Sequence, residues 1–222
     1  MTYNTCVSIA ETTPNRVLST LVKALRKSNY AEIRFDFLAP ENIPKTLHLI
    51  KKYSSRCVFT LRSNTEGGKF SGSEKERRSI LRLLAEYNPY FIDIEFSASG
   101  DKRLINYIKK TETPILVSWH DFKKTPSVFK LTKKYQKMKS VSKNIKIVTT
   151  ANSIKDTVSV LSLYKKQKSG LIAFAMGDYG RVSRILCLHL GSPFTYVSLG
   201  KPVAPGQFSL DEIKSLQNLK KQ

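Results

Sequence analysis

Short apolar runs alternate with amphipathic stretches along the whole chain. The apolar runs predict strands at residues 4–9, 31–37, 56–62, 90–96, 115–120, 144–149, 171–175 and 194–198. The stretches with a helical apolar period predict helices at residues 14–28, 40–52, 73–87, 102–111, 127–139, 154–168, 179–190 and 209–221. Alternation of this kind indicates parallel strands that are joined by right-handed crossovers.

Three successive predicted strands carry charged or polar side chains at every second position. These side chains are Glu32, Arg34 and Asp36, then Thr60 and Arg62, then Asp93 and Glu95. Because alternate side chains of a strand point to opposite faces, each strand has one polar and one apolar face. An edge strand with one wet face would explain any single case, but three in succession favour a closed interior. Buried charges must pair, so we expect one network that contains Glu32, Arg34, Arg62, Asp93 and Glu95.

The number of strand and helix pairs decides between a barrel and an open sheet. Eight such units in 222 residues match a compact (β/α)8 TIM barrel. A dinucleotide-binding open sheet would carry a glycine-rich turn after its first strand, but the first glycine of the chain is Gly67. No linker or charge block divides the sequence. We therefore predict an α/β protein in which residues 1–222 form a single TIM-barrel catalytic domain.

The charge of the chain raises the question of its partners. A formal net charge of +21 and a pI of about 9.9 are typical of nucleic-acid-binding proteins. Many of the lysines, however, lie in residues 123–143, beside an apolar helical stripe that contains Leu131, Tyr135 and Met138. This pattern predicts a solvated basic face, and we expect no nucleic-acid partner. The charge would attract an anionic small substrate. A basic nucleic-acid-binding or scaffold protein on an inactive barrel stays open as an alternative, and it would bind nucleic acid in a salt-sensitive way.

The sequence shows no pattern of a membrane helix, a secretion signal or a metal site. No run approaches the ~18 apolar residues of a membrane helix, and the first residues lack the pattern of a secretion signal. Cys6, Cys57 and Cys187 lie singly in apolar runs, without the close pairing of a zinc site. We expect reduced core cysteines, no metal and a cytoplasmic location.

Two reactive side chains lie on successive predicted strands. His120 ends one strand, and Lys146 lies in the middle of the next. Burial disfavours the charged form of a lysine, and a neutral amine can attack a carbonyl group to form an imine. Singly, a strand-end histidine is more often structural, and a strand lysine more often lies on a solvated edge. Their joint placement favours imine chemistry. A class I aldolase or a transaldolase-like barrel also uses a strand lysine in this way, and it stays open as one interpretation.

Further polar residues follow the predicted strands, where barrels carry their active sites. Glu66 precedes a pair of glycines that permits a tight loop, and Arg184 lies early in the predicted helix 179–190. A helix N-terminus together with a guanidinium group is suited to a carboxylate or a phosphate. Gln207 lies in a segment rich in proline and glycine, which predicts a lid over a bound ligand.

Six motifs, in order along nearly the whole chain, resemble the type I 3-dehydroquinate dehydratases, which are barrel enzymes of the shikimate pathway. They are EIRFD at 32–36, TLRSNTEGG at 60–68, SWHDFKKTP at 118–126, IKIVTTA at 145–151, AMGDYGRVSR at 175–184 and APGQ at 204–207. The resemblance implies that Lys146 forms an imine with 3-dehydroquinate, that His120 transfers protons, and that Glu66 lies beside it. It implies a substrate pocket formed by Ser8, Glu32, Arg34, Arg62, Met176, Arg184 and Gln207. It also implies a homodimer that needs neither cofactor nor metal and yields 3-dehydroshikimate.

Three positions depart from the pattern of this family. Val203 stands where many members have serine or threonine, Tyr196 where phenylalanine is familiar, and Phe174 where methionine is common. These departures leave the lysine and the histidine intact, and we expect them to affect the affinity for the substrate.

Overall fold

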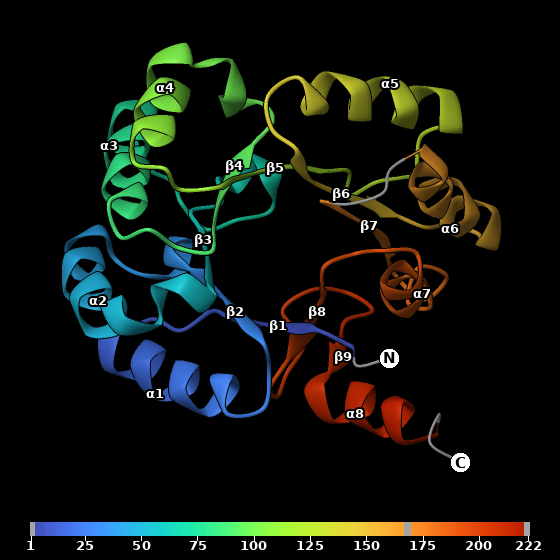
Figure 1. Ribbon diagram of the computed structural model, residues 1–222, viewed down its shortest axis with the longest axis horizontal. Helices are drawn as coiled ribbons and strands as arrows, with labels where there is room; N and C mark the ends of the chain where they lie inside the picture. Colours follow the sequence, from blue (N-terminus) through green and yellow to red (C-terminus); the bar gives the residue numbers. More distant parts are fainter. Residues whose placement is uncertain (1–2, 167–169, 220–222) are drawn as a thin grey trace. The chain divides into compact units, whose positions relative to one another are not determined.

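The structure is a computed structural model that describes residues 3–166 and 170–219 (Figure 1). The chain divides into two compact units. The N-terminal unit is Ser8–Leu116, and the C-terminal unit is Val117–Gln222 together with Met1–Val7. Each unit is described by itself below, and the single domain expected from the sequence stays a prediction. No helix among the described residues has the length and apolar character needed to cross a membrane.

Parallel strands form the centre of the N-terminal unit. They are β2 (Tyr30–Arg34), β3 (Cys57–Thr60) and β4 (Phe91–Glu95), with β3 in the middle. Its helices are α1 (Pro14–Leu25), α2 (Ile43–Ile50), α3 (Glu74–Ala85) and α4 (Lys102–Lys110). Thr60 pairs with Arg34 on one side and with Asp93 on the other, so β2 and β3 end level with each other and β4 extends two residues further. This register brings their polar side chains together.

Parallel strands also form the centre of the C-terminal unit. They are β6 (Asn144–Thr150) with β7 (Leu171–Met176), and β8 (Thr195–Ser198) between β1 (Thr5–Ile9) and β9 (Phe208–Ser209). Strand β5 (Ile115–His120) adjoins β6, and its last four residues belong to this unit. The helices are α5 (Val128–Lys139), α6 (Ile154–Leu161), α7 (Ser183–His189) and α8 (Leu210–Leu219).

Local sequence signals explain where several helices begin. The Ser73 side chain accepts a hydrogen bond from the Glu76 backbone N–H at the start of α3. Asp101 caps α4 in the same way, and Pro14 supplies the fixed φ that suits the first turn of α1. Buried apolar side chains then hold the helices on the strands, and Cys6, Cys57 and Cys187 are buried thiols, as predicted.

All eight predicted strands are present, but several predicted boundaries are wrong. The helix expected at 154–168 ends at Leu161 and is followed by a 3-10 helix at Ser162–Lys166, and residues 167–168 lie outside the described residues. The strand expected at 31–37 ends at Arg34, because Phe35–Phe37 forms a 3-10 turn in which the Leu38 N–H bonds to Phe35 O. The helix expected at 179–190 begins at Ser183, since the preceding residues form turns with bonds such as Gly180 N–H to Gly177 O. The short strand β9 follows the predicted lid and was not predicted.

Candidate active site

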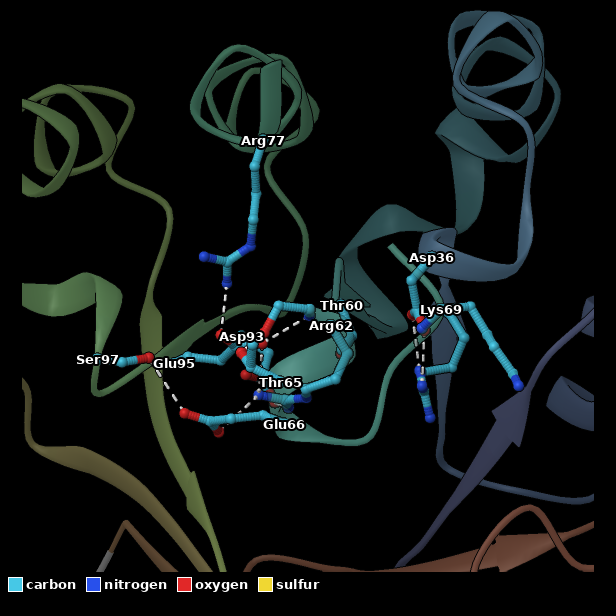
Figure 2. A network of polar contacts seen from close by, with 12 residues as sticks. Asp36, Thr60, Arg62, Thr65, Glu66, Lys69, Arg77, Asp93, Glu95 and Ser97 are labelled. Atoms are coloured by element: carbon cyan, nitrogen blue, oxygen red, sulfur yellow. Dashed lines mark hydrogen bonds and ion pairs between the residues drawn. The ribbon is translucent and has the colours of Figure 1, made fainter. Parts of the chain in front are cut away.

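A buried charged network lies at the C-terminal ends of β3 and β4 (Figure 2). At its centre is Arg62, whose Nη2 lies 2.7 Å from Asp93 Oδ2. Arg62 Nη1 lies 3.6 Å from Glu95 Oε1 and 3.8 Å from Glu66 Oε2. Burial lowers the pKa of Arg62, but the attraction of Asp93, Glu95 and Glu66 outweighs it and raises the pKa overall. Arg62 is therefore a permanent cation among carboxylates.

The network differs in one member from the one that the alternation predicts. Arg62, Asp93 and Glu95 are in contact as expected, and Glu32 accepts a hydrogen bond of 3.0 Å from Thr60 Oγ1. Arg34 instead forms a two-point ion pair with Asp36, with N to O distances of 2.8 and 2.7 Å. The 3-10 turn after β2 explains this difference, because it folds the Asp36 carboxylate back onto the guanidinium of Arg34.

The loop after β3 holds Glu66 close to this network. Its tight turn is closed by a 2.8 Å bond from the Gly68 N–H to Ser63 O, and a Cβ at Gly68 would overlap the Arg62 carbonyl oxygen. Glu66 Oε1 accepts a hydrogen bond of 3.1 Å from Ser97 Oγ. Burial raises the pKa of Glu66 to about 7, and the charge of Glu95 adds to the effect. The carboxyl group of Glu66 can therefore change its charge near neutral pH.

Lys146 lies in the C-terminal unit, within β6. Its side chain is only 6% exposed, so the expected burial is confirmed. The Nζ atom lies 4.1 Å from the centre of the Tyr196 ring on β8. The face of an aromatic ring carries negative charge and attracts a cation. The site can therefore stabilise a positive charge at the Lys146 nitrogen.

His120 projects from the same face of the sheet as Lys146. The Asp121 N–H donates to Val148 O at 2.9 Å, which places His120 level with Val148 on the neighbouring strand β6. Lys146 is two residues before Val148, so strand spacing and rise give a Cα separation of roughly 8 Å from His120. Side chains of this length can meet across that distance. The half-buried His120 ring also stacks on Phe122, with centroids 5.8 Å apart.

Arg184 is a second buried cation of the C-terminal unit. It lies at the start of α7, is 1% exposed, and has its guanidinium carbon 4.4 Å from the centre of the Phe174 ring. Its Nη2 donates to Pro205 O at 3.1 Å, whereas its Nε has no hydrogen-bond partner among the described residues. Burial lowers the pKa of Arg184 to about 10. An anion could accept a hydrogen bond from the Nε of Arg184 and compensate its charge. The helix N-terminus expected beside Arg184 does not contribute, because α7 has only seven residues.

Gln207 and the segment before it fold against the turn that follows β7. Gln207 Oε1 accepts a hydrogen bond of 2.8 Å from the Val203 N–H. A Cβ at Gly206 would lie 2.8 Å from Gly177 O, so only glycine allows this close approach. Met176 ends β7 and is buried, and Ser8 is half-buried in β1. Most of the predicted site residues therefore lie near the C-terminal end of a strand or in the loop that follows it, whereas Lys146 lies within β6 and Arg184 within α7.

The predicted network left out two supporting residues, Asp36 and Arg77. Asp36 binds Arg34 and also accepts a 3.0 Å bond from the Lys69 N–H. Arg77 reaches from α3 to Glu95, with an Nη2 to Oε2 distance of 2.8 Å. One signal was available, because Arg77 falls on the buried stripe of α3 that also contains Leu81 and Leu84.

Comparisons with known proteins agree with one another. The family model of the type I 3-dehydroquinases matches residues 5–222. A 3-dehydroquinate dehydratase from Methanocaldococcus jannaschii is 33% identical over 217 residues, which cover 96% of this chain and 97% of that protein. One from Pyrococcus abyssi is 35% identical over 188 residues, which cover 84% of this chain and 85% of that protein.

Solved structures give the same result for the fold. The 3-dehydroquinate dehydratase from Geobacillus kaustophilus has a TM-score of 0.88 at 21% identity and covers 100% of this chain and 92% of that one. The type I enzyme from Clostridium difficile, solved with covalently modified comenic acid, has a TM-score of 0.85 at 23% identity, with coverage of 98% and 92%. The enzyme from Aquifex aeolicus has a TM-score of 0.82 at 27% identity, with coverage of 97% and 98%. The predicted TIM-barrel class is confirmed. With a matching family model over nearly its whole length, the chain belongs to the type I 3-dehydroquinase family.

Proposed function

We propose that the chain removes water from 3-dehydroquinate to give 3-dehydroshikimate, through an imine between the substrate ketone and Lys146. The family and its curated relatives support the dehydratase reaction, which is a hydro-lyase step of aromatic amino acid biosynthesis. The observation that carries the proposal is the burial of Lys146 in the middle of β6 against the Tyr196 ring. The covalent ligand in the Clostridium difficile structure is in keeping with covalent chemistry in this family.

The reaction needs a place for the electrons of a carbon–hydrogen bond. The Lys146 amine adds to the ketone carbon, and the carbinolamine that forms takes up a proton and loses water to give an iminium. His120 then takes a proton from the carbon next to the iminium carbon, and the electron pair moves toward nitrogen. The pair returns to expel the hydroxyl group, which leaves as water with a proton from His120. A second water releases the product and restores the amine.

The ring of Tyr196 supports the charged stage of this sequence. It lies beneath the position where the iminium nitrogen forms and attracts its positive charge. Glu66 serves to orient the His120 imidazole and to favour the tautomer that accepts the proton. Because the pKa of Glu66 is about 7, the ability of its carboxylate to orient His120 depends on pH in the neutral range.

The remaining site residues bind the substrate. Arg184 is the partner of the substrate carboxylate, because it is a buried guanidinium without an ion pair among the described residues. Gln207 closes the carboxylate end of the pocket. The hydroxyl groups bind Glu32, Arg34 and Arg62, and Ser8 and Met176 line the pocket. These contacts turn binding energy into orientation of the reacting carbon.

Borohydride trapping tests the proposal directly. Reduction in the presence of 3-dehydroquinate should add a stable mass to the peptide that contains Lys146, and K146A should show neither the adduct nor turnover. The matched control is K143A, which removes an exposed lysine just before β6 and should behave as wild type. An adduct on another lysine, formed equally in K146A, would contradict the assignment.

We also propose a homodimer of single-domain barrels in the cytoplasm. Buried thiols suit a reducing compartment. Exposed Val158, which is 62% exposed, and Leu190 border a surface hollow of about 340 Å³ on the C-terminal unit, which suits contact with a second copy. Light scattering should give twice the chain mass for wild type and a lower mass for V158E. A monomeric wild type would refute this proposal without affecting the chemistry.

A further inference from the structure

Arg77 is a buried cation outside the set of substrate-binding residues. It lies on α3, is 3% exposed, and shares the buried stripe of that helix with Leu81 and Leu84. Figure 2 shows its side chain extending from α3 down to Glu95. Its Nη2 lies 2.8 Å from Glu95 Oε2, and its Nη1 lies 3.5 Å from the exposed Glu74 carboxylate. The stronger of the two pairs is therefore the buried one.

Glu95 connects Arg77 to the loop that follows β3. It is 2% exposed, and its Oε1 accepts a 2.8 Å bond from the Ser63 N–H. Its Oε2 accepts a 3.0 Å bond from Ser63 Oγ, and Arg62 lies 3.6 Å from Oε1. A carboxylate this deeply buried needs a compensating cation close by. Arg77 supplies one from the helix side, and Arg62 supplies another from the loop side.

We propose that Arg77 is a positioning residue, which holds Glu95 and balances its charge so that the loop after β3 presents Glu66 in its ionised form. This inference rests on the role of Glu66 in the proposed function. Arg77 forms ion pairs with Glu95 and Glu74, neither of which is a proposed substrate-binding residue. It acts through Glu95 and Ser63, which fix the first residues of the loop.

The charges around Glu66 give the direction of the effect. Arg62 from the end of β3 attracts its charge, Glu95 and Asp93 from β4 repel it, and Ser97 donates a hydrogen bond to it. Without Arg77, the charge of Glu95 loses its nearest compensation and repels Glu66 more strongly. The pKa of Glu66 should then rise above about 7. Removing the charge of Glu95 as well should lower it below the wild-type value.

Carbon-13 NMR of the Glu66 carboxyl group tests this order. The resonance is assigned with E66Q, and the midpoint is compared in wild type, R77M, R77K and R77M/E95Q. We expect R77M to titrate roughly one unit above wild type, R77K close to wild type, and R77M/E95Q below wild type. If R77M fails to fold, R77K is compared with R77M/E95Q. The titration midpoint of Glu66 must then be lower in R77M/E95Q than in R77K. Equal midpoints in all folded variants would overturn the proposal.

The pH dependence of catalysis supplies the second measurement. If ionised Glu66 is required, the low-pH limb of kcat/KM should move up in R77M and down in R77M/E95Q, and kcat of R77M should fall up to about a hundredfold. A merely structural role would lower activity without moving this limb in opposite directions. The matched control is R78M, which changes the neighbouring, 49% exposed arginine that pairs with Asp101. Absence of dehydratase activity in wild type would sink the proposed function, whereas the NMR midpoints would still decide the role of Arg77.

Discussion

Replacing Arg184 with methionine should make the folded chain more stable and the enzyme less active. The guanidinium is 1% exposed and lies over the Phe174 ring, but it has no ion pair among the described residues. Methionine fills much of the same volume and adapts to irregular gaps, so it leaves no large cavity. The substitution therefore removes a buried charge with little loss of packing.

The structure gives the size of the effect on stability. Burial lowers the pKa of Arg184 from its ordinary 12.5 to about 10, which corresponds to about 3 kcal/mol of destabilisation of the charged form. The group stays charged at pH 7 in both the folded and the unfolded chain, so this cost applies in full below pH 10. Loss of the hydrogen bond to Pro205 O subtracts about 1 kcal/mol. We expect R184M to be about 2 kcal/mol more stable than wild type.

The same substitution removes the proposed partner of the substrate carboxylate. Charge-assisted hydrogen bonds contribute about 1.5–3 kcal/mol each, so kcat/KM should fall about a hundredfold or more. Urea unfolding at pH 7 measures the free energy of unfolding, and steady-state kinetics measure the loss. The control is R181M, which changes an exposed arginine three residues earlier, before α7 begins, that pairs with Glu212. An R184M variant that is less stable than wild type and keeps kcat/KM within tenfold would refute the reasoning.

Three further predictions concern single side chains. E66Q should abolish the change of activity near pH 7. The pKa of Glu66 in the folded chain, about 7, lies above its ordinary value, so the activity of wild type should fall as the pH drops through 7. If E66Q still loses activity over this pH range, another group is responsible. Y196L should lower kcat about tenfold through loss of the ring beneath Lys146, and Y196F should retain most of it; equal loss in both would point to the hydroxyl group. G68A should destabilise the fold by about 1–3 kcal/mol, measured in urea, because its Cβ would overlap Arg62 O. The control G100A, which has nothing within 4 Å of an added Cβ, should be neutral.

Strand positions could be predicted because they depend on local alternation. The polar face that contains Glu32, Thr60 and Asp93 follows from a period of two, and the parallel register then makes these residues neighbours. The motif order was enough to indicate the family. The partner of Arg34 could not be predicted, because it depends on a turn that brings Asp36 back onto β2. The pair of Arg77 and Glu95 joins a helix to a strand, and no local pattern specifies such a contact.

The buried charges of the two units differ in a way that bears on substrate binding. Among the described residues, every buried carboxylate lies in the N-terminal unit, at Glu32, Asp36, Asp93 and Glu95, whereas the C-terminal unit buries the Lys146 amine and the guanidinium of Arg184. A buried guanidinium without an ion pair among the described residues, such as that of Arg184, makes the folded chain less stable than it could be. A ligand with one carboxylate compensates the charge of Arg184, so its binding should stabilise the folded chain. Ligand binding to the folded form raises Tm with concentration. The product 3-dehydroshikimate should therefore raise the Tm of wild type clearly, and it should raise the Tm of R184M much less, because that variant no longer carries the charge that the ligand offsets.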